Sequence, residues 1–152
     1  MSDSRTQIEA LIYTYAERLD GGDFEGVAAL FEHGRISAEG AGPAAEGRDA
    51  VLALYADSVR RYEDGTPRTR HLTTNVVITV DEDAGTATSS AYFIVLQQLD
   101  DFPLQAIVAG RYCDGFVRAD GVWRFATRHM YLDLIGDVSR HLLIALPNRG
   151  DA

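Results

Sequence analysis

The chain has 152 residues, of which 46% are hydrophobic and 24% charged, the composition of an ordinary globular domain. Its 14 basic residues stand against 23 acidic ones, so the formal net charge is -9. This balance argues against nucleic acid as a partner, because binding a phosphate backbone requires a basic surface. It also argues against an anionic membrane surface as a partner.

Residue usage excludes further kinds of chemistry. Every basic residue is an arginine, so Schiff-base catalysis and a phosphate-loop lysine are excluded. Cys113 is the single cysteine, which excludes an internal disulfide and a cysteine-based metal cluster. The first residues are polar and no apolar run reaches the length of a membrane span, so we expect a cytoplasmic protein.

Residues 4–20 are predicted to form the first helix. Apolar side chains recur there every three to four positions, Ser4 and Gln7 can form a capping box, and Gly21-Gly22 would end the helix. Asp20 stands in the last turn beside the apolar stripe, where the helix dipole disfavours a carboxylate. We therefore expect Asp20 to have a cationic or hydrogen-bonding partner.

Two shorter helices are expected next, one capped by Asp23 and one over residues 48–62, with a short strand at 34–38 between them. Long strands are then predicted over residues 68–80, 86–99, 104–118 and 122–134. Short turn-like connections between these strands indicate an antiparallel meander. The apolar tail at 138–146 is predicted to form a short helix.

Helices followed by antiparallel strands indicate an α+β fold, with the helices covering one face of a curved sheet. A cavity between the two layers would suit a small hydrophobic molecule. Aromatic side chains from both layers are expected to close this cavity: Tyr15, Phe31, Tyr55, Tyr92, Tyr112 and Phe125.

The strand that starts near residue 68 is expected to supply the polar groups of the cavity. Side chains alternate between the two faces of a strand, so His71, Thr73, Asn75 and Val77 should share one face. That face is polar at its start and apolar further along, which is typical of a small-ligand pocket. On this pattern Asn75 can hydrogen-bond a ligand.

Five short motifs lie in a fixed order along the chain: RLDGGDF at 18–24, EGRDA at 46–50, RHLTTN at 70–75, GRY at 110–112 and DGVWRF at 120–125. Together they resemble the SnoaL-like branch of the nuclear-transport-factor-2-like superfamily over nearly the whole chain. The resemblance implies one domain across residues 1–152, with a core of about residues 5–142. It also implies a cone of three N-terminal helices packed on a curved antiparallel sheet.

Several dehydratases and a dehydrochlorinase of that superfamily use a His–Asp pair, and Asp20 and His71 match its positions. A tyrosine and an arginine assist in the bile-acid dehydratase type, where Tyr15 and Arg128 match. The resemblance implies a lyase or isomerase, dehydratase- or cyclase-like, that needs no cofactor or metal. His71 would take a proton from a small apolar substrate, polyketide- or steroid-like, while Asp20 fixes its tautomer.

Two other functions fit the same fold: a non-catalytic small-molecule-binding protein, and a structural small subunit of a ring-hydroxylating oxygenase. The subunit would expose an apolar patch that includes residues 142–146. A homo-oligomer, either a dimer or a trimer, is expected in any case, because an open sheet hides a face or an edge against another copy.

Several site residues have a structural alternative. His71 could have the structural role of ordering its strand and no catalytic role. Tyr15 could be a core residue, and Arg128 could form an ion pair. Arg111 and Tyr112 are neighbours on one strand, so only one of them can face the pocket.

Three remaining residues are expected to take no part in the site. His33 and His141 stand near element ends and are expected to be solvated, and Cys113 is expected to be a small core residue.

Overall fold

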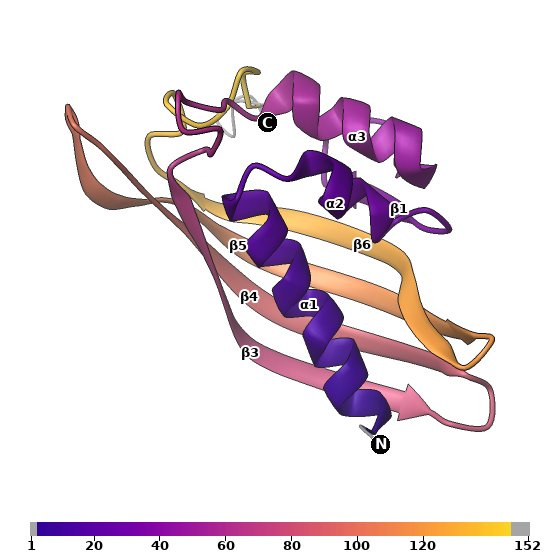
Figure 1. The fold of residues 1–152 in the computed structure, drawn as a ribbon. Helices are drawn as coiled ribbons and strands as arrows, with labels where there is room; N and C mark the ends of the chain where they lie inside the picture. The colour runs from indigo at the N-terminus through magenta and orange to yellow at the C-terminus, as the bar shows by residue number, and fades with distance from the viewer. Residues whose placement is uncertain (1–2, 147–152) are drawn as a thin grey trace.

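The structure is a computed structural model that describes residues 3–146. Its elements follow in the order α1 (Ser4–Asp20), α2 (Phe24–Ala29), β1 (Arg35–Ala38), β2 (Ala45–Glu46), α3 (Gly47–Ser58), β3 (Thr69–Asp81), β4 (Thr86–Leu99), β5 (Phe102–Ala119) and β6 (Val122–Ile135). The predicted α+β fold is confirmed, with the three helices packed on a curved sheet (Figure 1). Within the described residues, no helix combines the length and the apolar character needed to cross a bilayer.

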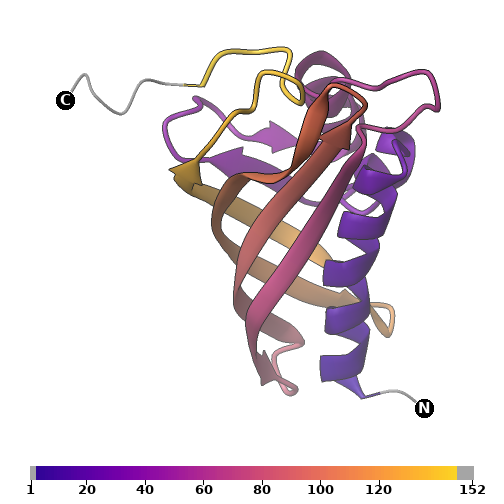
Figure 2. The ribbon, with the colours of Figure 1, turned by 90° about the vertical axis from the view of Figure 1, so that its left-hand side faces the viewer.

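The six strands form one unclosed sheet in the order β2-β1-β6-β5-β4-β3. Strands β3 to β6 form the predicted antiparallel meander, whereas β1 pairs parallel with β6. The sheet curls toward the helices, and α1 runs alongside β3 at one edge (Figure 2). The concave face of the sheet and the apolar faces of the helices therefore enclose the interior.

Helix α1 covers the predicted residues but begins with a different cap. The Asp3 side chain accepts a hydrogen bond from the backbone N–H of Thr6 at 2.8 Å. Ser4 already lies inside the helix, and its hydroxyl donates to Glu82 at 3.1 Å. The predicted capping box is wrong because Asp3, one residue earlier, satisfies the free N–H group.

The end of α1 lies unusually close to the turn that precedes β3. Gly22 has a φ of +73°, and a Cβ there would stand 1.9 Å from the carbonyl oxygen of Gly65. Glycine tolerates both the left-handed backbone and the close approach. This contact brings the last residue of α1, Asp20, to the first residues of β3.

Strand β3 contains a bulge that exchanges its two faces. Its register with β4 shifts between Thr74 and Val77, and Asn75 has a φ of +55°, a conformation that asparagine adopts more readily than most residues. His71 faces the interior before the bulge, and Ile78 faces it after the bulge. Asn75 is exposed, so the prediction that it shares the face of His71 is wrong.

The C-terminal segment, residues 136–146, forms no helix, contrary to the prediction. It folds back beside the end of α3, where Leu142 forms an antiparallel bridge with Val59. In Figures 1 and 2 this yellow segment lies close to α3 and to the loop before β3. The tail therefore closes one end of the space between sheet and helices.

Candidate functional site

Asp20, at the end of α1, meets His71 near the start of β3. Its Oδ1 lies 2.5 Å from Nδ1 of His71 and accepts the Thr69 hydroxyl at 2.9 Å. Its Oδ2 accepts the backbone N–H of His71 at 2.8 Å. The two side chains are only 6% and 13% exposed, for His71 and Asp20 respectively. A carboxylate on Nδ1 leaves Nε2 as the ring nitrogen available to other groups.

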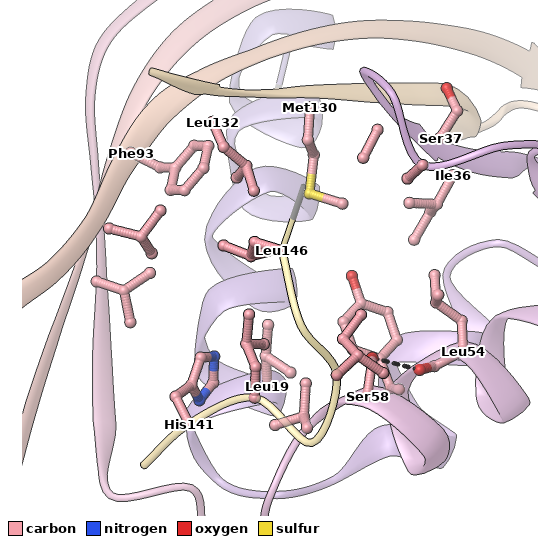
Figure 3. Close-up of a pocket in the computed structure, with 18 of the residues that line it drawn as sticks. Leu19, Ile36, Ser37, Leu54, Ser58, Phe93, Met130, Leu132, His141 and Leu146 are labelled. Carbon is pink, nitrogen blue, oxygen red and sulfur yellow. Dashed lines mark hydrogen bonds between the residues drawn. The ribbon is translucent and has the colours of Figure 1, made fainter. Parts of the chain in front are cut away.

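His71 forms part of the wall of a cavity of about 240 Å³ between the sheet and the helices. Most of the wall is apolar, as Figure 3 shows for Leu19, Ile36, Leu54, Phe93, Met130 and Leu132. The tail contributes Leu142, Ile144 and Leu146. An apolar chamber with a few polar groups is the usual form of a small-molecule site.

Three of the predicted tyrosines line the cavity, namely Tyr15, Tyr55 and Tyr112. The hydroxyls of Tyr15 and Tyr55 are 2.5 Å apart, and the Tyr112 ring stacks on Phe93 at 4.4 Å. Burial raises the pKa of all three tyrosines, so they are neutral phenols at neutral pH. Two hydroxyls that share one hydrogen bond retain one O–H that can donate to a ligand.

Arg128 does not reach the cavity wall. It lies opposite Asp114 in the register of β5 and β6, and its Nε and Nη2 donate to the two carboxylate oxygens at 2.9 Å each. Its guanidinium lies over the rings of Tyr112 and Tyr15, at 3.7 and 4.3 Å from their centroids. Burial disfavours the charge, but Asp114 outweighs burial and raises the pKa of Arg128. This geometry agrees with the structural ion pair.

Two predicted substrate-binding residues lie away from the cavity. Phe31 is fully buried and stacks on Phe125 at 4.7 Å, in the core beside the cavity. Tyr92 is 54% exposed, because strand alternation turns it to the outer face of the sheet. Arg111 also lies on that face in an exposed ion pair, so Tyr112 is the neighbour that faces the interior.

His141 also belongs to the cavity wall, contrary to the sequence-based expectation. It was expected to be solvated, but it is 5% exposed and lines the cavity, with its ring centroid 6.3 Å from that of His71. Burial, together with the neighbouring His71, lowers the pKa of His141 to about 4. No local pattern marks this residue, because its position depends on the return of the tail.

Cys113 and His33 lie outside the cavity wall. Cys113 is exposed, so the prediction that it is a core residue is wrong. His33 is exposed, as predicted. Among residues 3–146, no group of three or more His, Cys, Asp or Glu side chains gathers in a way that could hold a metal ion.

The three helices and the curved open sheet define the class of the protein by its fold, which is NTF2-like. Within this class the chain belongs to the SnoaL-like domain family, which matches residues 1–129. No curated protein matches the chain in sequence.

Solved structures show the same fold. An NTF2-like protein with a cystatin-like fold from Novosphingobium aromaticivorans is 24% identical, over 90% of this chain and 85% of its own, with a TM-score of 0.71. ActVI-ORFA from Streptomyces coelicolor is 25% identical, over 85% of this chain and 96% of its own, with a TM-score of 0.68. A candidate scytalone dehydratase from Novosphingobium aromaticivorans is 25% identical, over 86% of this chain and 84% of its own, with a TM-score of 0.65.

Proposed function

We propose that this chain is a lyase or isomerase that works without a cofactor, in which His71 removes a proton from a small apolar substrate. The observation that carries this proposal is the 2.5 Å contact between Asp20 Oδ1 and His71 Nδ1 at the wall of an apolar cavity. The carboxylate holds the proton on Nδ1, so that the Nε2 lone pair can accept a proton from carbon. It also stabilises the imidazolium that results.

The tyrosines supply the second half of the chemistry. When a C–H next to a carbonyl gives its proton to His71, negative charge develops on the carbonyl oxygen. The hydroxyl pair of Tyr15 and Tyr55 can donate to that oxygen, and the raised pKa of both tyrosines keeps them protonated for this role. Arg128 acts only through the rings of Tyr15 and Tyr112, as a positioning residue.

The proton that His71 has taken can leave the imidazolium in two ways. In an elimination, a hydroxyl leaving group departs from the adjacent carbon and takes the proton from the imidazolium, which yields an alkene and water. In an isomerisation, the imidazolium returns the proton to a different carbon. The dehydratase name of one 25% identical neighbour supports the elimination.

The test uses β-tetralone, a bicyclic apolar ketone with acidic C–H groups beside its carbonyl. In D2O the protein is expected to exchange those hydrogens faster than buffer does, as followed by proton NMR. Asp20→Asn and His71→Gln should lose the acceleration. Glu17→Gln is the matched control, because it changes an exposed carboxylate on the same helix and should leave the rate unchanged.

Equal exchange in the natural protein and in His71→Gln would contradict the proposal. Binding of β-tetralone without any exchange would favour the non-catalytic binding protein instead. Co-purification with a larger oxygenase chain would favour the structural subunit, for which Leu143 and Ile144 are the exposed apolar residues of the tail.

We also propose that the chain forms a homo-oligomer through the outer face of the sheet. Leu72, Val77 and Tyr92 are 40%, 59% and 54% exposed there, on the adjoining strands β3 and β4. Apolar side chains on neighbouring strands favour burial against another copy. Sedimentation velocity should show a dimer or trimer that Tyr92→Arg dissociates, whereas a monomeric natural protein would contradict the proposal.

The cytoplasmic location stays a prediction.

A further inference from the structure

The cavity wall contains a hydrogen-bonding atom that no protein group satisfies. His141 is 5% exposed and lines the cavity, and its Nδ1 is buried without a hydrogen-bond partner among the described residues. A buried polar atom left unpaired costs about 1–3 kcal/mol, so such atoms are rare unless a ligand or a water pairs with them. The unpaired nitrogen therefore points to a missing hydrogen-bond partner in the cavity.

The backbone around His141 is firmly held. Its N–H donates to the Val138 carbonyl at 3.0 Å, and its own carbonyl accepts the N–H of Arg60 at 2.8 Å. The carbonyl of Arg140 accepts from the amide of Gln97 at 3.1 Å. These bonds fix the backbone at residue 141, and the fold thereby places the imidazole of His141 at the cavity wall.

The imidazole of His141 is neutral at neutral pH, because burial lowers its pKa to about 4. Figure 3 shows His141 across the cavity from Phe93 and Leu132, and its ring lies 6.3 Å from the ring of His71. A neutral imidazole has one donor and one acceptor nitrogen, and which nitrogen carries the proton depends on its partners. A hydroxyl both donates and accepts, so it can satisfy the free Nδ1 in either tautomer of His141.

We propose that His141 forms a subsite for a hydroxyl group on an otherwise apolar ligand. The subsite lies beside His71, so the hydroxyl of the substrate would be held next to the group that takes the proton. This inference rests on the proposed function only in treating the cavity as the substrate site. It does not require His71 to be catalytic, and its test measures binding rather than turnover.

The test compares two probes of nearly the same shape, β-naphthol and β-methylnaphthalene, by the fluorescence of the naphthalene ring. The natural protein should bind β-naphthol about three- to tenfold more tightly, the value of one neutral hydrogen bond. His141→Phe should bind both probes equally and retain its affinity for β-methylnaphthalene. His33→Gln is the matched control, because it alters an exposed histidine and should keep the preference.

A second measurement covers the case in which His141→Phe displaces the tail. In the natural protein, the ¹⁵N resonance of His141 Nδ1 should move when β-naphthol binds and stay in place when β-methylnaphthalene binds. An unmoved resonance with β-naphthol bound would overturn the subsite. A preference for β-naphthol that survives in His141→Phe would also overturn the subsite. So would a natural protein that shows no preference, or one that binds neither probe.

The two proposals fail in different ways. If every variant keeps β-tetralone exchange and the β-naphthol preference depends on His141, the subsite stands and the catalytic proposal is wrong. Conversely, exchange that depends on His71, with no β-naphthol preference, would leave catalysis standing and remove the subsite. Asp20→Asn should keep the β-naphthol preference, because Asp20 hydrogen-bonds His71 and not His141.

Discussion

Asp20 and His71 are 51 positions apart in the chain, yet Oδ1 of the one lies 2.5 Å from Nδ1 of the other. The same carboxylate accepts the backbone N–H of His71, so the ring and the strand that carries it are held together. Three hydrogen bonds also explain why an acidic residue stands at a helix C-terminus, where the dipole disfavours it. The contact therefore joins helix α1, strand β3 and one wall of the cavity.

We predict that Asp20→Asn changes the tautomer of His71. The carboxylate can only accept, so it selects the ring with a proton on Nδ1, whereas an amide can also donate. The ¹⁵N spectrum of His71 should change from one tautomer to a mixture. Exchange of β-tetralone should fall by about 100-fold or more, because fewer rings have a free Nε2 lone pair and the carboxylate no longer stabilises the imidazolium. An unchanged tautomer would show that Asp20 does not orient the ring.

The stability of the protein should fall between pH 6.5 and pH 4 because of His141. Its pKa is about 4 in the folded chain and 6.5 in the unfolded chain, so the unfolded state binds the extra proton as pH falls. The contribution is fully present above pH 6.5 and is lost on acidification. Burial is the main cause of the lowered pKa of His141; the neighbouring His71 adds to the shift and Asp20 opposes it.

Urea unfolding at pH 7 and pH 5 measures the effect of His141. Between these two values the natural protein should lose about 2 kcal/mol more unfolding free energy than His141→Phe. Parallel losses in the two proteins would show that His141 titrates normally in the folded state.

Asp114→Ala should destabilise the protein strongly. It leaves Arg128 fully buried with no counter-ion, and breaking a buried pair in this way costs about 3–5 kcal/mol. Arg111→Ala is the matched control on the same strand, because its side chain is 46% exposed and its ion pair should contribute less than about 1 kcal/mol. Urea unfolding separates the two, and equal losses would contradict the structural role of the buried pair.

The bulge in β3 makes a prediction about Asn75. Asn75→Val should cost about 1–2 kcal/mol of stability, because a β-branched residue is strained at positive φ. Thr79→Val is the control, since it places the same side chain on an exposed part of the same strand. Neither variant should alter β-tetralone exchange. A stable Asn75→Val would show that the bulge is absent or lies elsewhere.

Gly22→Ala tests the contact that brings α1 to β3. Its Cβ would stand 1.9 Å from the Gly65 carbonyl oxygen, so the turn must shift. Gly40→Ala is the control, because Gly40 has a similar φ of +75° with no atom within 4 Å and should cost only about 1 kcal/mol. Thermal unfolding should show the larger loss for Gly22→Ala, and the ¹⁵N signals of His71 should move only in that variant.

Local sequence patterns predicted the order and type of the main elements. The periodicity of residues 4–20 predicted α1 to the residue, and the turn-like connections predicted the meander of long strands. The sequence also singled out Asp20, because a carboxylate beside an apolar stripe needs a partner. These inferences depend on neighbours in the chain, and periodicity reports such local relations well.

Tertiary structure alone decided which side chains line the cavity. Alternation along a strand cannot reveal the bulge at Asn75. It also cannot say which face the curved sheet turns inward. The sheet turns Tyr112 toward the interior and Tyr92 toward the outer face. The return of the tail, which buries His141 next to His71, depends on contacts with residues about 80 positions away, such as the bridge from Leu142 to Val59. Such long-range contacts leave no pattern in the local sequence, because the packing of the whole chain selects them.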